Sequence, residues 1–162
     1  MHHILVVEDN YDILAVMHDL LEGDGYRVTL ANNGQEGLAA FAQEVPDLII
    51  SDLMMPRLDG FGLLAAVRSQ AHGAAVPFLF LSARTEAAIT TRARSLGADD
   101  YLFKPFAPED LLIAVRAKLD RRRTLQMFDT RSAHLQTVIM LANTIEARES
   151  YTRGHVDRVQ KY

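Results

Sequence analysis

The sequence of 162 residues contains no cysteine. Disulfide frameworks, thiolate nucleophiles and cysteine-based zinc sites are therefore excluded. A chain without cysteine is compatible with the cytoplasm, which is the location we expect. No apolar run approaches the roughly 18 to 20 residues that a membrane-spanning helix needs, and the first residues lack the basic patch and cleavage site of a secretory signal. We therefore expect no membrane partner.

The chain also has little positive charge. Lys and Arg number 17 against 21 Asp and Glu, which gives a formal net charge of −4. Domains that bind nucleic acid usually carry a net basic face, so we expect no direct nucleic-acid partner. An Arg triplet at residues 121–123 could form a local basic patch, but a solvated helix face is the commoner explanation of such a run.

Short apolar runs that favour β-structure alternate with segments of helical spacing. The predicted strands cover residues 4–7, 27–31, 47–51, 78–81 and 101–103. The predicted helices cover residues 11–21, 34–44, 59–69 and 86–96, and a fifth begins near residue 108. Strict alternation with almost uniformly apolar strands predicts an α/β fold, in which helices cover both faces of a five-stranded parallel sheet.

Polar residues follow four of the predicted strands where each strand ends. Glu8 and Asp9 follow the first strand, and Asp52 follows the third. Ser82 follows the fourth strand, and Lys104 follows the fifth. Because functional groups of open parallel sheets gather at the carboxyl ends of the strands, we expect these five side chains to meet at one edge.

Clustered carboxylates are costly to bury unless a cation accompanies them. Mg²⁺ prefers carboxylate and carbonyl oxygens, which Asp9, Asp52 and the Met54 carbonyl could supply, and Lys104 adds a second cation. A carboxylate held in this way can attack a phosphoryl donor and form an aspartyl phosphate. Ser82 could then donate a hydrogen bond to the phosphoryl group.

Each of these residues also has an ordinary structural explanation. An Asp at a strand end is often a helix cap or a turn residue, and a lone Lys is usually solvated. Five such residues at successive strand ends are much harder to explain in this way. The combination therefore favours a phosphoryl-transfer site.

Four segments resemble motifs of the response-regulator receiver family. Residues 4–10 resemble its acidic-pair start, and residues 47–60 resemble its phosphorylation-site signature. Residues 80–83 and 97–106 resemble its hydroxyl strand and its lysine strand. The resemblance covers residues 1 to about 120. It implies a CheY-like, flavodoxin-like fold with strand order 2-1-3-4-5, and it implies a sensor histidine kinase or a phosphotransfer protein as partner.

The resemblance also implies a role for each motif residue. Asp52 would be the phosphoacceptor, and Mg²⁺ or Mn²⁺ would be held by Glu8, Asp9, Asp52 and the Met54 carbonyl. The phosphoryl-binding and switch positions would be Ser82, Ala83, Tyr101, Lys104 and Pro105.

Two of these positions carry further expectations. The Lys104–Pro105 bond is expected to be cis, and Tyr101 is expected to turn inward when Ser82 contacts the phosphoryl group. A tyrosine at the start of a strand is also often a packing residue. A flavodoxin-like cofactor binder would share the strand order. It would need a phosphate-cradling first loop, for which the segment Glu8-Asp9-Asn10 has the wrong charge.

Residues 109–153 contain neither Gly nor Pro, which favours a long helix. Two groups of apolar residues in it have spacings of three and four, and this pattern predicts a coiled-coil seam in a homodimer. These residues are Leu112, Val115 and Leu119, and then Leu135, Val138, Ala142 and Ile145. The register breaks at residues 121–129, where a kink, a short loop or a skip is expected. Residues 121–145 would be a linker or signalling helix.

Residues 146–162 resemble the start of an HD-GYP domain, a family of metal-dependent cyclic di-GMP phosphodiesterases. The resemblance implies that the chain is the first part of a longer regulator. His155 would be a metal ligand only in a complete domain, so this chain is expected not to be an enzyme. The alternative is a stand-alone adaptor that dimerises on phosphorylation and has no enzymatic output.

Overall fold

The computed structural model describes residues 1–83 and 87–159, and describes side chains as far as residue 143. The chain divides into two compact units, Met1–Arg121 and Arg122–Tyr162. The strands are β1 (His3–Val7), β2 (Arg27–Ala31), β3 (Leu48–Asp52), β4 (Phe78–Ser82) and β5 (Asp100–Phe103). The helices are α1 (Tyr11–Gly23), α2 (Gly34–Gln43), α3 (Gly60–Arg68), α4 (Ala87–Ser95) and α5 (Pro108–Val159). None of the described helices combines the length and the apolar character that crossing a membrane requires.

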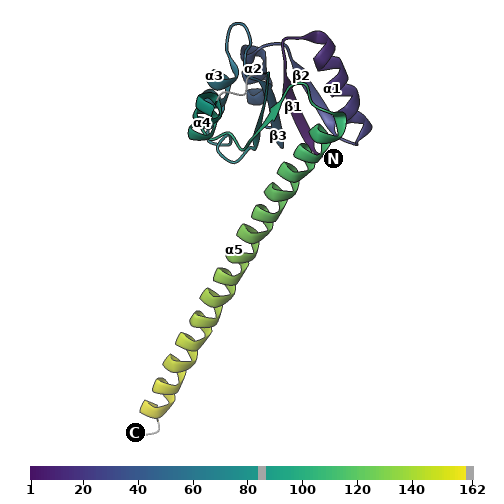
Figure 1. Cartoon of the computed structure of the whole chain (residues 1–162). Helices are drawn as coiled ribbons and strands as arrows, with labels where there is room; N and C mark the ends of the chain where they lie inside the picture. Colours follow the sequence, from purple (N-terminus) through teal and green to yellow (C-terminus); the bar gives the residue numbers. More distant parts are fainter. Residues whose placement is uncertain (84–86, 160–162) are drawn as a thin grey trace. The chain divides into compact units, whose positions relative to one another are not determined.

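The five strands form one parallel sheet in the order β2-β1-β3-β4-β5 (Figure 1). β1, β3 and β4 are fully buried, as their continuous apolar runs predict. The strand order and the alternation with helices confirm the predicted fold class. The parallel arrangement also brings the carboxyl ends of all five strands to the same edge of the sheet.

Two apolar layers cover the sheet. On one face, Leu14 and Met17 of α1 pack with Leu111 and Val115 from the first turns of α5. On the other face, residues of α2, α3 and α4 pack against alternate residues of the same strands. Phe80 of β4 lies at the centre of this second layer. Its ring centroid is 5.5 Å from that of Phe61 and 5.0 Å from that of Phe78.

Polar caps fix where three helices begin. The side chain of Asn10 accepts hydrogen bonds from the backbone at the start of α1, and those of Asn33 and Asp59 do the same for α2 and α3. A side-chain oxygen at this position satisfies backbone N–H groups that have no partner within the helix. The caps therefore set how soon each helix starts after the strand that precedes it.

The long C-terminal helix is present, but half of the predicted seam is wrong. Val115 and Leu119 are 0% and 4% exposed, and both belong to the core of the first unit, with Leu112 partly buried beside them. Side chains buried inside one chain cannot also form a seam with another chain. Of the kink, short loop or skip expected at residues 121–129, the short loop is wrong, because α5 continues through these residues as helix. The side chain of Ile145 lies outside the described residues.

His3 is a buried titratable residue at the amino end of β1. Its side chain is 7% exposed, and its Nε2 lies 2.7 Å from the Thr29 hydroxyl oxygen. Its Nδ1 has no hydrogen-bond partner among the described residues, and the nearest Glu44 oxygen is 3.8 Å away. Burial lowers the pKa of His3 below its usual value of 6.5, and the positive charge of Arg27 lowers it further.

We expect the free energy of unfolding to fall as the pH drops below about 6.5. The unfolded chain then takes up a proton on His3 before the folded chain does, so protonation favours unfolding. Above that pH the imidazole is neutral in both states and the effect disappears. Urea unfolding measures this free energy at several pH values. In His3→Gln it should depend less steeply on pH than in the unaltered chain. The more exposed His18 supplies the control, and an equal flattening in His18→Gln would contradict this assignment.

Candidate functional site

Three carboxylates meet at the carboxyl edge of the sheet. Glu8 and Asp9 follow β1, and Asp52 is the last residue of β3. One oxygen from each lies within 4.8 Å of the other two. Glu8 and Asp52 are buried, whereas Asp9 is exposed. Among the side chains that the structure describes, this is the one group of three acidic or histidine residues close enough to share a metal ion.

Lys104 brings a positive charge into this cluster. Its Nζ lies 2.7 Å from Glu8 Oε2 and 3.5 Å from Asp52 Oδ1. The side chain is only 18% exposed, so solvent screens these ion pairs weakly. The backbone N–H of Lys104 donates to the carbonyl of Ser82 at 2.8 Å, which joins the ends of β4 and β5. The Lys104–Pro105 peptide bond is cis, as the resemblance implied.

The backbone around Asp52 fixes its carboxylate. The N–H of Leu53 donates to Asp52 Oδ1 at 2.8 Å, and the Ser51 hydroxyl donates to the Asp52 carbonyl at 2.8 Å. Gly60 opens α3 directly against this residue, since a Cβ at that position would lie 2.5 Å from the Asp52 carbonyl oxygen. A glycine is therefore required where α3 approaches the end of β3.

Burial raises the pKa of Glu8 to about 7, although the hydrogen bond from Lys104 acts in the opposite direction. Burial also raises the pKa of Asp52, and the charge of Lys104 again opposes the change. Repulsion between the carboxylates adds to burial, because the charge of Asp52 raises the pKa of Glu8 and the charge of Asp9 raises that of Asp52. A site with this excess of negative charge favours a further cation.

The predicted switch residues lie on β4 and β5. Ser82 ends β4 and is 2% exposed, and Ala83 follows it on the surface. The Tyr101 ring packs against Phe80 and Phe103, with centroid distances of 6.0 and 5.2 Å. The Tyr101 hydroxyl is buried and has no hydrogen-bond partner among the described residues. The structure therefore brings Ser82 and Lys104 to the carboxylate edge, whereas Tyr101 pairs with Phe80 further back in the sheet.

The loop after Asp52 holds the remaining predicted ligand, Met54, whose side chain is 56% exposed. In the same loop Arg57 has a φ of 69°. That value lies in the left-handed region, which non-glycine residues seldom adopt.

Asn10 is a contributor that the sequence analysis missed. Its N–H donates to Glu8 Oε1 at 3.2 Å while its side chain caps α1. An Asn that directly precedes a helical pattern is the signal that could have revealed the cap.

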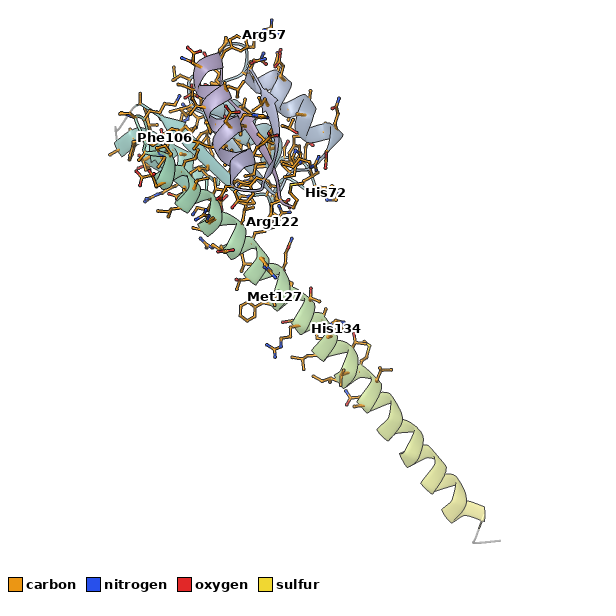
Figure 2. All side chains as sticks on the ribbon, turned by 90° about the vertical axis from the view of Figure 1, so that its right-hand side faces the viewer. Arg57, His72, Phe106, Arg122, Met127 and His134 are labelled. Carbon is orange, nitrogen blue, oxygen red and sulfur yellow. The ribbon has the colours of Figure 1, made fainter. Side chains whose placement is uncertain are left out.

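A groove of about 490 Å³ lies beside this edge. Its walls come from α1 and from the residues around the end of β5. The lining residues are Asp12, Ile13, Val16, Met17, Ala83, Lys104, Pro105 and Phe106. Phe106, labelled in Figure 2, lies two residues before α5 begins. Lys104 lines the groove and also contacts Asp52, so the groove adjoins the carboxylate cluster at this side chain.

The chain resembles known proteins over most of its length. A family model described as the response regulator receiver domain matches residues 4–116. The chain is 40% identical over 134 residues to a probable transcriptional regulator, ycf27, of Guillardia theta, which covers 83% of this chain and 50% of that protein. It is 33% identical over 123 residues to the response regulator SaeR of Staphylococcus aureus, covering 76% of this chain and 53% of that protein. The chain thus spans about half the length of the curated relatives it matches.

Solved structures show the same fold. The chemotaxis protein CheY4 of Vibrio cholerae is 35% identical with a TM-score of 0.71, and the match covers 74% of this chain and 99% of that protein. The receiver domain of a sensor histidine kinase from Pseudomonas aeruginosa is 31% identical with a TM-score of 0.69, covering 74% and 98%. That structure has a magnesium ion coordinated in the active site cleft.

Proposed function

The chain belongs to the response regulator receiver domain family, and on this premise we propose that it accepts a phosphoryl group on Asp52. The donor is the phosphohistidine of a sensor histidine kinase or of a phosphotransfer protein in the cytoplasm. The observation that carries the proposal is the position of Asp52, buried beside Glu8 and 3.5 Å from Lys104. A carboxylate in this setting is held in place and has a cation beside it for the incoming charge.

The contacts of Asp52 indicate which oxygen reacts. Leu53 N–H and Lys104 both approach Oδ1, which leaves Oδ2 as the attacking atom. Oδ2 forms a bond to phosphorus while the bond between phosphorus and the donor imidazole nitrogen breaks, and the electron pair stays on that nitrogen. Lys104 then neutralises part of the charge on the phosphoryl oxygens. Its attraction for the Asp52 carboxylate also opposes the protonation that burial favours.

The same residues fit a divalent cation of the hard, oxygen-binding type. We assign Mg²⁺ or Mn²⁺ to Glu8, Asp9, Asp52 and the Met54 carbonyl. The fit rests on three acidic oxygens within 4.8 Å of one another and on the raised pKa of Glu8. When bound, such a cation stabilises negative charge on the transferring phosphoryl group. The magnesium ion in the P. aeruginosa receiver supports this assignment.

The output of the switch is proposed to arise at β4 and β5. Ser82 and the backbone of Ala83 bind the phosphoryl group together with Lys104, and Pro105 holds the turn that follows. The hydroxyl of Tyr101 has no hydrogen-bond partner among the described residues, and it turns inward and gains one when Ser82 contacts the phosphoryl group. The face formed by α4, β5 and the start of α5 then changes conformation, and this change switches the dimeric C-terminal helix.

The groove beside α1 is proposed to receive the phosphodonor. Val16 on its wall is 57% exposed, and Ile13 and Phe106 extend the apolar surface. A helix that carries a phosphohistidine can bury apolar side chains there and present its phosphoryl group to Asp52. Exposed apolar surface at the rim of a polar site is typical of a protein contact.

For the rest of the protein we propose a homodimer through the helix of residues 121–145, followed by an HD-GYP domain that begins at residues 146–162. The resemblance of that last segment supports this arrangement. Its side chains, including His155, lie outside the described residues. The chain itself would not hydrolyse a cyclic dinucleotide. The alternative, a dimerising adaptor without an output enzyme, is distinguished by reading the complete open reading frame.

Incubation with Mg²⁺ and acetyl phosphate should add one phosphoryl group to the intact chain. EDTA should prevent the addition, because the carboxylate cluster then lacks its cation. Intact-mass spectrometry measures the adduct, and beryllofluoride binding detects a site whose adduct is short-lived. A folded protein that shows neither an adduct nor beryllofluoride binding would refute the proposed phosphoryl transfer.

A further inference from the structure

The second compact unit, Arg122–Tyr162, carries a band of exposed apolar side chains on α5. These side chains are 57% to 74% exposed. They are Leu125, Met127, Phe128, Leu135, Val138, Ile139, Met140 and Leu141. Figure 2 shows Met127 and His134 standing out from the helix. Within the described part of this unit no element other than α5 is present. A lone helix is only marginally stable in water, so such a band favours a partner.

Part of this band follows two rows with a strict seven-residue spacing, which keep Leu135 and Ala142 of the seam predicted from the sequence but place Ile139 in it instead of Val138. Leu125, Ser132 and Ile139 form one row. A second row lies three residues further along and consists of Phe128, Leu135 and Ala142. Alternating steps of three and four residues keep both rows on one side of a helix, which is the pattern of a coiled-coil seam. The described seam therefore runs from Leu125 to Ala142.

The seam cannot extend into the first unit. The positions fourteen and seven residues before Leu125 are Leu111 and Lys118. Leu111 is 0% exposed in the core of the first unit. Lys118 Nζ lies 3.1 Å from Asp100 Oδ2 and donates to the Asp99 carbonyl at 3.3 Å. Because these residues already have partners inside Met1–Arg121, pairing with another helix starts at Leu125.

We propose that a second copy of this chain covers the seam as a parallel, in-register, two-stranded coiled coil, with Ser132 setting the register. The proposal rests on the homodimer proposed above and specifies its surface and orientation. An identical helix suits the seam because both rows keep the same spacing. Each seam residue of one helix then lies opposite the same residue of the other, and such a pair forms one layer. Pairing six side chains from each helix buries roughly 1,000 Å², close to the smallest specific interfaces.

Ser132 decides between the two orientations. In a parallel in-register pair, its hydroxyl faces the same hydroxyl of the second copy, and the two can form a hydrogen bond. An antiparallel pair with the same layers places Ser132 opposite Leu135. The hydroxyl would then lose water without gaining a partner, which is unfavourable. A single polar residue in an apolar seam is a known means of fixing register.

The absence of cysteine allows a direct test by disulfide cross-linking. Ser132→Cys and Leu135→Cys are each oxidised in the full chain, both alone and as a mixture. Thr130→Cys is the control, because Thr130 lies outside both rows and its hydroxyl bonds to Gln126 of its own helix. We expect each seam variant to cross-link with itself at least tenfold faster than the control. Cross-linking only between the two different seam variants would show an antiparallel pair and overturn the proposal.

Two further readouts separate this inference from the proposed function. Light scattering gives the mass in solution, and phosphoryl incorporation at Asp52 is measured on the same samples. A dimer whose seam variants cross-link no faster than Thr130→Cys pairs through another surface, which overturns the seam alone. A monomer at micromolar concentration overturns the seam and the dimer. In both cases the test of Asp52 is unaffected, because acetyl phosphate reacts with the first unit alone.

Discussion

Asp52→Asn is expected to reduce phosphoryl incorporation from acetyl phosphate below detection. An amide has no nucleophilic oxygen comparable with a carboxylate, so the phosphoryl group has no acceptor at this position. The substitution keeps the shape of the side chain and an oxygen that can accept the 2.8 Å hydrogen bond from Leu53 N–H. The fold should therefore persist. Intact-mass spectrometry at equal times, with and without Mg²⁺, measures the effect.

The free energy of unfolding should rise in the same variant at neutral pH. Burial raises the pKa of Asp52, so its charged form is unfavourable in the folded state, and Glu8 lies beside it. Removing that charge relieves repulsion within the carboxylate cluster. Urea unfolding at pH 7.5 without metal tests the direction of this change.

Asp59→Asn is the matched control for this experiment. Asp59 lies in the loop after Asp52 and caps α3 through a 2.7 Å hydrogen bond from Gly62 N–H. Asn caps helices about as well as Asp, so this variant should take up a phosphoryl group like the unaltered chain. An undiminished adduct in Asp52→Asn would assign the acceptor to another carboxylate, with Asp9 first among those to be mapped.

The sheet and its functional edge were predictable because they depend on periodicity and direction. Apolar runs of three to five residues that alternate with helical segments leave few arrangements other than a covered parallel sheet. The chain direction then places Asp52 and Lys104 at the same edge, and the structure shows their side chains 3.5 Å apart. No side-chain contact had to be known for that inference.

Other features depend on packing that spacing alone does not reveal. Val115 and Leu119 have the spacing of a coiled-coil seam, yet they are buried inside the first unit. A row of apolar residues on a helix shows that one face is covered, but not by which surface. The spacing of apolar residues also did not show that the helix continues through residues 121–129. Arg, Leu, Gln and Met there favour helix, and this preference is independent of the seam register.

The pKa shifts of the site could be derived only from the structure. Burial raises the pKa of Glu8, and the 2.7 Å contact with Lys104 opposes that change, and neither effect can be read from the sequence. The left-handed φ of Arg57 was also unforeseen, because the residue type gives no sign of it.

Lys104→Met is expected to slow phosphorylation of Asp52 by roughly 100- to 1,000-fold, the range found when one stabilising group is removed from a transition state. Lys104 contacts both Glu8 and Asp52 at the site. Without it, the Asn10 hydrogen bond is the protein contact left to oppose the effect of burial on the pKa of Glu8. A larger share of Glu8 is then protonated near pH 7, and the phosphoryl group loses its ammonium partner. Methionine keeps most of the apolar stem, so packing changes little.

The rate is measured from the growth of the intact-mass adduct at saturating Mg²⁺, and beryllofluoride affinity is measured in parallel. Lys118→Met is the control, since Lys118 pairs with Asp100 away from the carboxylate cluster and is similarly shielded from solvent. That variant should react within about threefold of the unaltered chain, a change of less than 1 kcal/mol in the barrier. If Lys104→Met reacted as fast as the unaltered chain, the ammonium group of Lys104 would serve only the ion pair with Glu8 in the unphosphorylated protein. The phosphoryl charge would then be stabilised by the bound cation and the backbone around Ala83.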